Sequence, residues 1–180
     1  ALGYVALTAN TTGGENTAVG YEALDANTDG GNNTAIGSNA LTANTTASNN
    51  TAVGKSALAA NTTGEDCVAV GEQALRSNTT ANYNIAIGSQ ALEANTTGTT
   101  NVAIGHQALT TNTTGGENTA VGYRALVSAT GNNNTAVGGE AGEQVTTGYS
   151  CTAIGFRAGE ELTTSYQTTA IGAYALDDNT

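Results

Sequence analysis

The chain lacks the residues from which most globular cores are built. Its 180 residues include no proline, methionine or tryptophan, one phenylalanine and one histidine, against 24 glycines. This composition excludes a globular core of large side chains and leaves a thin core of Ala, Val, Ile and Leu repeated along the chain. Low complexity with little charge can also mean disorder, but the strict register of the apolar residues argues against a disordered chain.

Basic residues are equally scarce. Four Lys and Arg stand against fifteen Asp and Glu, a formal net charge of −11. Because nucleic-acid binding depends on Lys and Arg that contact phosphates, we expect no nucleic-acid partner, and no attraction to an anionic membrane surface. The apolar runs are only a few residues long, which predicts no membrane insertion of this segment, and no signal peptide is recognisable. Since the chain starts and stops inside a repeat, we interpret it as part of a longer array.

What the chain has in abundance is one repeat. The tripeptide Ala-[Leu/Val/Ile]-Gly recurs eleven times at intervals of 17 residues, with one interval of 16. We call its glycines the coil glycines: Gly3, Gly20, Gly37, Gly54, Gly71, Gly88, Gly105, Gly122, Gly138, Gly155 and Gly172. A fixed period of this length predicts a solenoid of stacked coils. We therefore expect one array over residues 1–180, an all-β parallel β-solenoid of about eleven 17-residue coils. GxxAL coils occupy 1–137 and 172–180, and variant GxxAG coils occupy 138–171.

Each copy of Thr-Ala-Val-Gly predicts a strand that is buried on both faces. Alternate residues of a strand point to opposite faces. One face carries Val or Ile with Thr, Val or Ile two residues earlier, the other carries Ala and Gly, and neither face carries a charge. A single coil has only one interior, so we expect the second face to pack against another chain. The alternative is a flat single-chain solenoid with an outer face of small residues.

The other half of the coil reads Gly-x-x-Ala-Leu-x-Ala-Asn-Thr-Thr-Gly. Ala and Leu are good helix formers, so this segment predicts a single helical turn before the Asn-Thr-Thr-Gly turn. Two coils lack the Leu and have Gly142 or Gly159 there, and three residues later they have Val145 and Leu162 where Asn is usual. Residues three apart share one side of a helical turn, so we interpret Val145 and Leu162 as filling the space of the missing Leu.

The structural core follows from these ranks. We predict that it includes the following residues and their equivalents in the other coils: Ala18, Val19, Gly20, Ala23, Leu24, Ala86, Ile87, Gly88, Ala91, Leu92, Val145 and Leu162.

The motif Asn-Thr-Ala-[Val/Ile]-Gly-x-x-Ala, seen at residues 16–23 and 33–40, resembles the head repeats of trimeric autotransporter adhesins. It is also similar to longer-period repeats of phage tail fibres and related surface proteins. The resemblance covers the whole chain, although the Ala-Leu-x-Ala segment makes this coil longer than those of the adhesin heads. It implies a left-handed β-roll, three chains packed side by side with the Val/Ile strands facing the trimer axis or neighbouring chains, and a role in surface attachment.

Residues with the potential for chemistry are few and scattered. His106, the only histidine, occupies a variable outward position, so no Ser/His/Asp or Cys/His set can form within one chain. Cys67 and Cys151 lie five coils apart, roughly 24 Å at strand spacing, which is too far for a disulfide. We expect no catalytic, cofactor-binding or metal-binding residues.

One rank of carboxylates is the exception that we weigh. Glu143, Glu160 and Asp177 share a position in three consecutive coils, and Glu161 and Asp178 stand beside the last two. Stacked carboxylates repel one another unless they are splayed into water or bridged by a cation. We favour a solvated ladder and keep Ca²⁺ as the alternative.

These observations predict a non-enzymatic fibre segment. We expect a stiff extracellular shaft or head at a cell or virion surface, a homo-oligomer with a trimer favoured, whose ligand would be a cell-surface or matrix component. The alternatives are a self-assembling extracellular filament and, less favoured, an ice-binding solenoid, which calls for two outward Thr per strand. An enzyme of the tailspike kind would need paired carboxylates in a groove.

Overall fold

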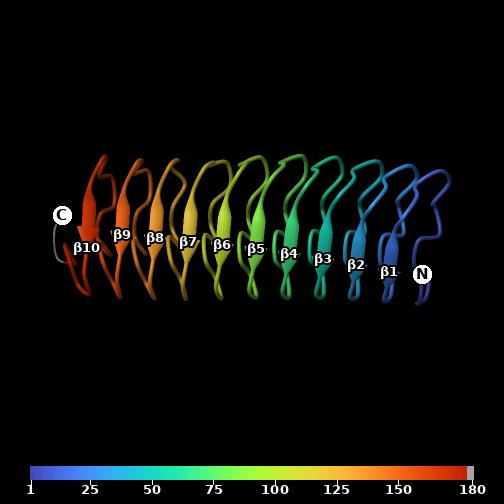
Figure 1. Ribbon diagram of the computed structural model, residues 1–180, viewed down its shortest axis with the longest axis horizontal. Coiled ribbons are helices and arrows are strands. Elements are labelled where there is room, and N and C mark those ends of the chain that lie inside the picture. The colour runs from blue at the N-terminus through green and yellow to red at the C-terminus, as the bar shows by residue number, and fades with distance from the viewer. Residues whose placement is uncertain (178–180) are drawn as a thin grey trace.

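The computed structural model describes residues 1–177, which form a rod of stacked coils with one strand per coil (Figure 1). Ten parallel strands follow one another in a single sheet in chain order. They are β1 (Thr17–Val19), β2 (Thr34–Ile36), β3 (Thr51–Val53), β4 (Val68–Val70), β5 (Ile85–Ile87), β6 (Val102–Ile104), β7 (Thr119–Val121), β8 (Thr135–Val137), β9 (Thr152–Ile154) and β10 (Thr169–Ile171). The expected parallel β-solenoid is confirmed, with ten strands rather than eleven, because the first repeat contributes only a bridge between Leu2 and Val19.

The strands pair in exact sequence register, so every rank of residues forms a straight row along the rod. Ala18 pairs with Ala35, and the same Ala-to-Ala pairing continues to β10. The 16-residue interval leaves this register intact, since Thr119 pairs with Thr135. The missing residue is therefore absorbed in the turns outside the sheet.

The predicted helical turn is wrong, and residues 1–177 contain no helix, so none that could cross a membrane. In the Gly-x-x-Ala-Leu segment the second and fourth residues after the coil glycine adopt left-handed conformations, with φ of 53° at Glu22 and 54° at Leu24. The N–H of Leu24 donates to the carbonyl of Ala40 in the next coil, at 3.0 Å. A left-handed Leu costs about 1–2 kcal/mol. Full burial of its side chain and the hydrogen bond to the next coil offset that cost.

The coil glycine is required by conformation and by space. Gly88 has a φ of 133°, which side chains rarely permit, and a Cβ there would lie 2.5 Å from the carbonyl oxygen of Gly105 in the next coil. Its own N–H donates to the carbonyl of Val70 at 2.7 Å. Glycine therefore allows successive coils to approach each other closely at the end of each strand.

Two rows of Asn run through the interior of the coils. In the first row, Asn44 Nδ2 donates to Asn27 Oδ1 at 2.9 Å and to the carbonyl of Ala47 at 3.0 Å. In the second row, the N–H of Asn50 donates to Asn33 Oδ1 at 2.9 Å. All four Asn are fully buried. Each buried amide is thus satisfied by the neighbouring coil and by a turn carbonyl, which is the condition for burying polar groups without a large penalty.

A third row explains why Thr follows each coil glycine by eight residues. Thr62 Oγ1 donates to the carbonyl of Thr79 at 3.0 Å, and Thr79 Oγ1 donates to the carbonyl of Thr96 at 3.2 Å. The hydroxyl therefore links one coil to the next at the turn.

The interior is formed by the Ala and Leu ranks. Ala18, Ala23, Leu24, Ala86, Ala91 and Leu92 are all fully buried. Val19 and Ile87 lie on the outer side of the sheet, Ile87 with 39% of its surface exposed, so they lie outside the interior of the single chain and could join a core only against another chain. Gly20 and Gly88 are partly buried at the end of their strands. Within one chain the interior therefore needs only the Ala side of each strand.

Val145 and Leu162 occupy the space of the missing Leu side chains. A Cβ on Gly142 would lie 3.4 Å from Val145 Cγ2, and a Cβ on Gly159 would lie 2.8 Å from Leu162 Cδ1. Both side chains are at most 2% exposed. The exchange also removes a strained residue, because Gly142 and Gly159 keep the left-handed φ of 59° and 60° that Leu adopts elsewhere.

Replacing a core Leu should destabilise the rod. Leu92→Asn removes a fully buried aliphatic side chain and places an amide among Ala and Leu, so we expect a loss of roughly 2–4 kcal/mol in the free energy of unfolding. Urea denaturation followed by circular dichroism measures it. His106→Ala, at an exposed position, is the control and should change stability by less than about 0.5 kcal/mol. Equal losses in the two variants would contradict this assignment of interior and surface.

Candidate functional site

The outer face of the sheet is the most distinctive surface of the molecule. Each strand presents its first and third residues outward, while its second residue, an Ala, points into the coil. All twenty outward residues are β-branched: Thr17, Val19, Thr34, Ile36, Thr51, Val53, Val68, Val70, Ile85, Ile87, Val102, Ile104, Thr119, Val121, Thr135, Val137, Thr152, Ile154, Thr169 and Ile171. We call this surface the sheet face.

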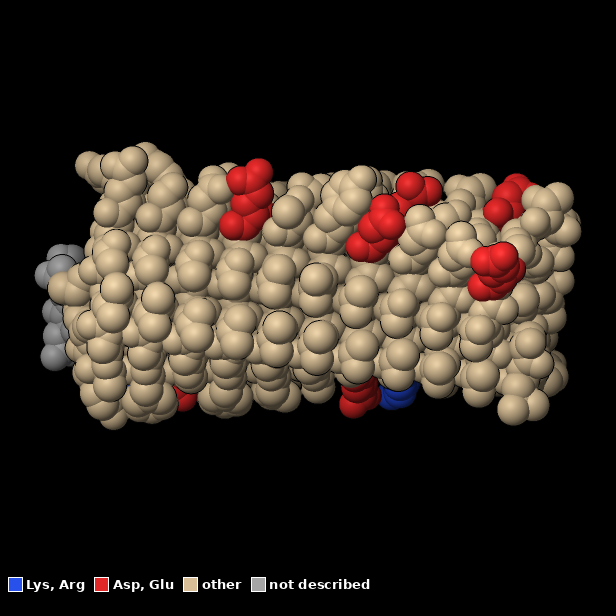
Figure 2. All heavy atoms as spheres, in the orientation of Figure 1, with Lys and Arg blue, Asp and Glu red and all other residues tan. Residues whose placement is uncertain are grey.

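The sheet face is uncharged and partly open to solvent. Its more exposed members include Ile36, Ile104 and Val137, each with 37–40% of its surface accessible. Figure 2 shows this face toward the viewer, with charged side chains only toward its upper and lower rims. On the side where the chain enters the strands, the charged residues are all acidic: Glu15, Asp29, Glu65, Asp66 and Glu117.

The sheet face is also rigid. β-branched side chains have restricted χ1 rotamers, and the parallel pairing fixes every row at the strand spacing of about 4.8 Å. A partner that covers this surface would therefore immobilise little that is free to move, which lowers the entropic cost of binding.

The predicted carboxylate rank is neutralised by arginines instead of being solvated. Arg124 Nη2 lies 2.6 Å from Glu143 Oε1. Arg157 Nε forms an ion pair with Glu160 and lies 3.9 Å from Glu140 and 3.8 Å from Asp177.

Burial and these contacts shift the pKa values of two carboxyl groups in this rank. Burial raises the pKa of Glu143, which Arg124 partly offsets, and the hydrogen bond from Arg157 lowers the pKa of Glu160. No group of three His, Cys, Asp or Glu within residues 1–177 is arranged to hold a metal ion, and Asp178 lies outside these residues.

Sequence reasoning missed these ion pairs, although the repeat carries their signal. Lys55 and Glu72, Arg76 and Glu93, and Glu140 and Arg157 are each 17 residues apart, and each pair is bridged. Opposite charges separated by one period come to lie side by side on neighbouring coils. A search of the sequence at this spacing would have found these three pairs, but not Arg124 with Glu143 or Arg157 with Glu160, whose separations differ from the period.

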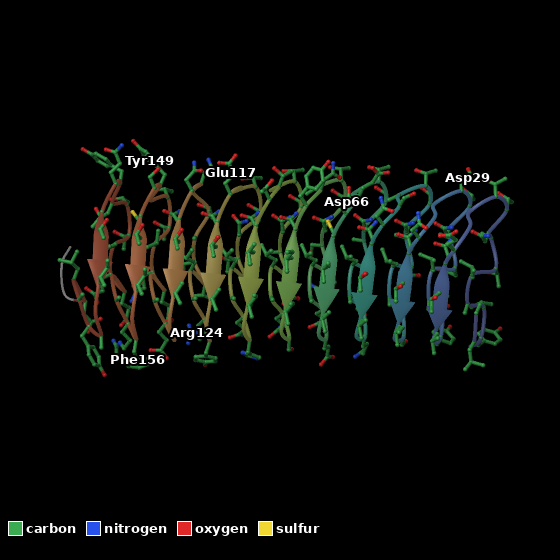
Figure 3. The ribbon with its side chains drawn as sticks, in the orientation of Figure 1. Asp29, Asp66, Glu117, Arg124, Tyr149 and Phe156 are labelled. Atoms are coloured by element: carbon green, nitrogen blue, oxygen red, sulfur yellow. The ribbon has the colours of Figure 1, made fainter. Side chains whose placement is uncertain are left out.

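His106 is exposed and stacks on Tyr123 in the next coil, with ring centroids 5.8 Å apart. Tyr149 and Tyr166 stack in the same way on the opposite rim, at 5.8 Å. Figure 3 shows Tyr149 at the upper rim and Phe156 at the lower rim. His106 therefore belongs to a surface row of aromatic rings and contacts no group that could act with it as a nucleophile.

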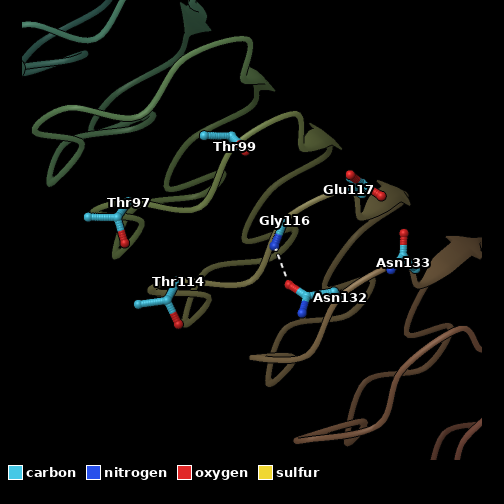
Figure 4. Close-up of a pocket in the computed structure, with 7 residues that line it drawn as sticks. All are labelled: Thr97, Thr99, Thr114, Gly116, Glu117, Asn132 and Asn133. Atoms are coloured by element: carbon cyan, nitrogen blue, oxygen red, sulfur yellow. Dashed lines mark hydrogen bonds between the residues drawn. The ribbon is translucent and has the colours of Figure 1, made fainter.

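A polar hollow of about 310 Å³ lies where the repeat is one residue short. Its lining residues are Thr97, Thr99, Thr114, Gly116, Glu117, Asn132 and Asn133 (Figure 4). Gly116 has no side chain in a rank where Thr99 and Asn132 have one, and its N–H donates to Asn132 Oδ1 at 2.7 Å. Hydroxyl, amide and carboxylate groups can hydrogen-bond a small polar molecule here. Because the lining contains no His, Cys or Lys, it offers no activated nucleophile.

The two cysteines replace Asn in the second interior row. Both are buried and unpaired with each other. The N–H of Cys67 donates to Asn50 Oδ1 at 3.0 Å, and its Sγ lies 3.4 Å from the carbonyl of Ala81. Burial raises the pKa of the Cys67 thiol to about 11. The thiol is thus protonated and shielded, the opposite of a reactive cysteine.

No protein-family model, curated protein or solved structure matches the chain.

Restoring Asn in the second row should strengthen it. In Cys67→Asn the amide can donate to the carbonyl of Ala81 and accept the N–H of Asn84, as other Asn of this row do. We expect the free energy of unfolding to rise by about 0.5–1.5 kcal/mol, measured by urea denaturation near neutral pH. Cys67→Ala, which offers no hydrogen bond, is the matched control and should not be more stable than the parent chain.

The raised pKa of Cys67 also predicts a loss of stability in alkali. The ordinary pKa of 9.0 applies to the unfolded chain and about 11 to the folded one, so the unfolded thiol loses its proton first. The contribution of this group is complete below about pH 9 and falls by up to about 3 kcal/mol as the pH rises to about 11. Urea denaturation at a series of pH values measures this fall. The Cys67→Asn variant should lack this part of the decline, and an identical decline in both chains would refute it.

Proposed function

We propose that this chain is a segment of a non-enzymatic structural or adhesive fibre, a stiff extracellular β-solenoid that associates with copies of itself through the sheet face. The observation that supports the proposal is the sheet face itself, with twenty outward β-branched residues, no charge and side chains partly open to solvent. A charge of −11 covers the rest of the molecule, so this face is the surface along which like-charged copies repel one another least.

The architecture suits a shaft. Within residues 1–177 every coil stacks on the next in the same way, so the array can be lengthened by adding coils, and such uniformity suits a shaft better than an active site, which needs one coil to differ. The resemblance to adhesin heads and tail fibres favours three chains in a left-handed β-roll, located at a cell or virion surface, which attaches to a cell-surface or matrix component. A filament of the same coils is the alternative assembly.

Ice binding receives less support. The outward positions carry one Thr in seven strands and none in β4–β6, where the equivalent residues are Val68, Ile85 and Val102. A face built to order water through hydroxyl rows would need them on every strand.

A charge on the sheet face should abolish self-association. We expect the parent chain to sediment at micromolar concentration as an oligomer, with three times the 17.7 kDa chain mass favoured. Ile104→Asp should raise the dissociation constant roughly 100-fold or more, because like charges then meet across the interface. His106→Asp, two residues further along on the rim, should leave the oligomer intact. A parent chain that is monomeric yet folded would overturn the proposal.

A further inference from the structure

The two rows of the sheet face differ in one place. The row at the end of the strands is Val or Ile throughout, and the row at the start is Thr in seven strands. In β4, β5 and β6 the starting residue is also aliphatic. Six neighbouring side chains then form one continuous aliphatic patch: Val68, Val70, Ile85, Ile87, Val102 and Ile104.

The aliphatic patch is exposed in the single chain. Ile85, Ile87 and Ile104 each keep 36–39% of their surface accessible. An outward Thr can satisfy its hydroxyl with water, whereas an outward Val or Ile gains only by being covered. The most favourable part of the sheet face to cover therefore lies in β4–β6.

A second copy of the chain is the partner that fits. Rows about 4.8 Å apart along the whole rod can interdigitate continuously only with a surface of the same period. Ten strands about 10 Å wide give a face of roughly 500 Å² per copy, so two copies bury about 1,000 Å², the lower limit for a specific interface. At that size the affinity depends on a small central group of well-covered side chains.

A uniform repeat has a difficulty that the aliphatic patch resolves. If every coil were alike, two rods could slide by one coil and meet nearly the same surface again, so their axial register would be undefined. A slide of one coil moves a row of the patch onto Thr and leaves aliphatic surface uncovered. The patch is thus the part of the sheet face that distinguishes one register from the next, as a single exceptional core residue does in a coiled coil.

We infer that the aliphatic patch fixes the axial register of self-association, so that β4–β6 of one copy contact β4–β6 of another. The inference rests on the proposed self-association and adds to it which strands meet.

The test removes the patch and then moves it, and the variant with the moved patch keeps the composition of the parent chain. One variant removes it (Val68→Thr, Ile85→Thr and Val102→Thr), and a second also rebuilds it on β7–β9 (Thr119→Val, Thr135→Ile and Thr152→Val). Circular dichroism and thermal melting establish that each variant is folded. We expect removal to raise the dissociation constant about tenfold or more, and rebuilding to restore it to within a few-fold of the parent.

Mixing then reads the register directly. Isotope-labelled parent chain is mixed with the variant that carries the moved patch, and native mass spectrometry counts mixed and unmixed oligomers. Register set by the patch predicts that mixed oligomers fall about tenfold below the statistical proportion, because aligned patches leave the rods offset by three coils. A statistical mixture would overturn the inference while leaving self-association standing. A parent chain that does not associate at all would overturn the proposed function itself.

Discussion

Hydrogen bonds between successive coils are the constraint on which this structure depends. Each strand, turn and buried amide finds its partner about one repeat away in a neighbouring coil, as Leu24 does with Ala40 and Asn44 with Asn27. For these bonds to form in every coil, every coil must adopt the same conformation, including its left-handed residues. The periodic sequence follows from this requirement, because a residue that fits one coil fits the same rank in all of them.

The same constraint explains which ranks are free to vary. The coil glycine cannot change, since a Cβ on Gly88 would meet the carbonyl of Gly105. The two residues after it lie on a rim and accept Tyr, Lys, Glu or His. The variability of the sheet face is intermediate. Its side chains are not part of the interior of the single chain, and yet they are β-branched in every strand. This uniformity is the observation from which contact with another surface is proposed.

The sequence predicted the stack of coils because its period is visible without any knowledge of conformation, and the parallel register followed from it. It predicted the helical turn wrongly because the helix propensity of Ala and Leu is a local property. The left-handed conformation of Leu24 is instead held by its hydrogen bond to Ala40 in the next coil. The inward position of Asn27 and Asn44 was missed for a similar reason. In an isolated segment Asn-Thr-Thr-Gly is turn chemistry, and only stacking supplies the partners that let the amide be buried. Alternation separated Ile87 from the Ala face of its strand without saying which face is inside, and only the resemblance to adhesin heads implied that the Val/Ile side faces outward.

The direction of the hydrogen bonds between coils determines how the rod responds to force. They run along its axis, so a pull on its two ends places all the junctions between coils under tension in series. Such a rod yields by releasing coils successively, each adding about 50–55 Å of extended chain. Tension along the rod would therefore be relieved in steps, and the coils that remain would keep their structure.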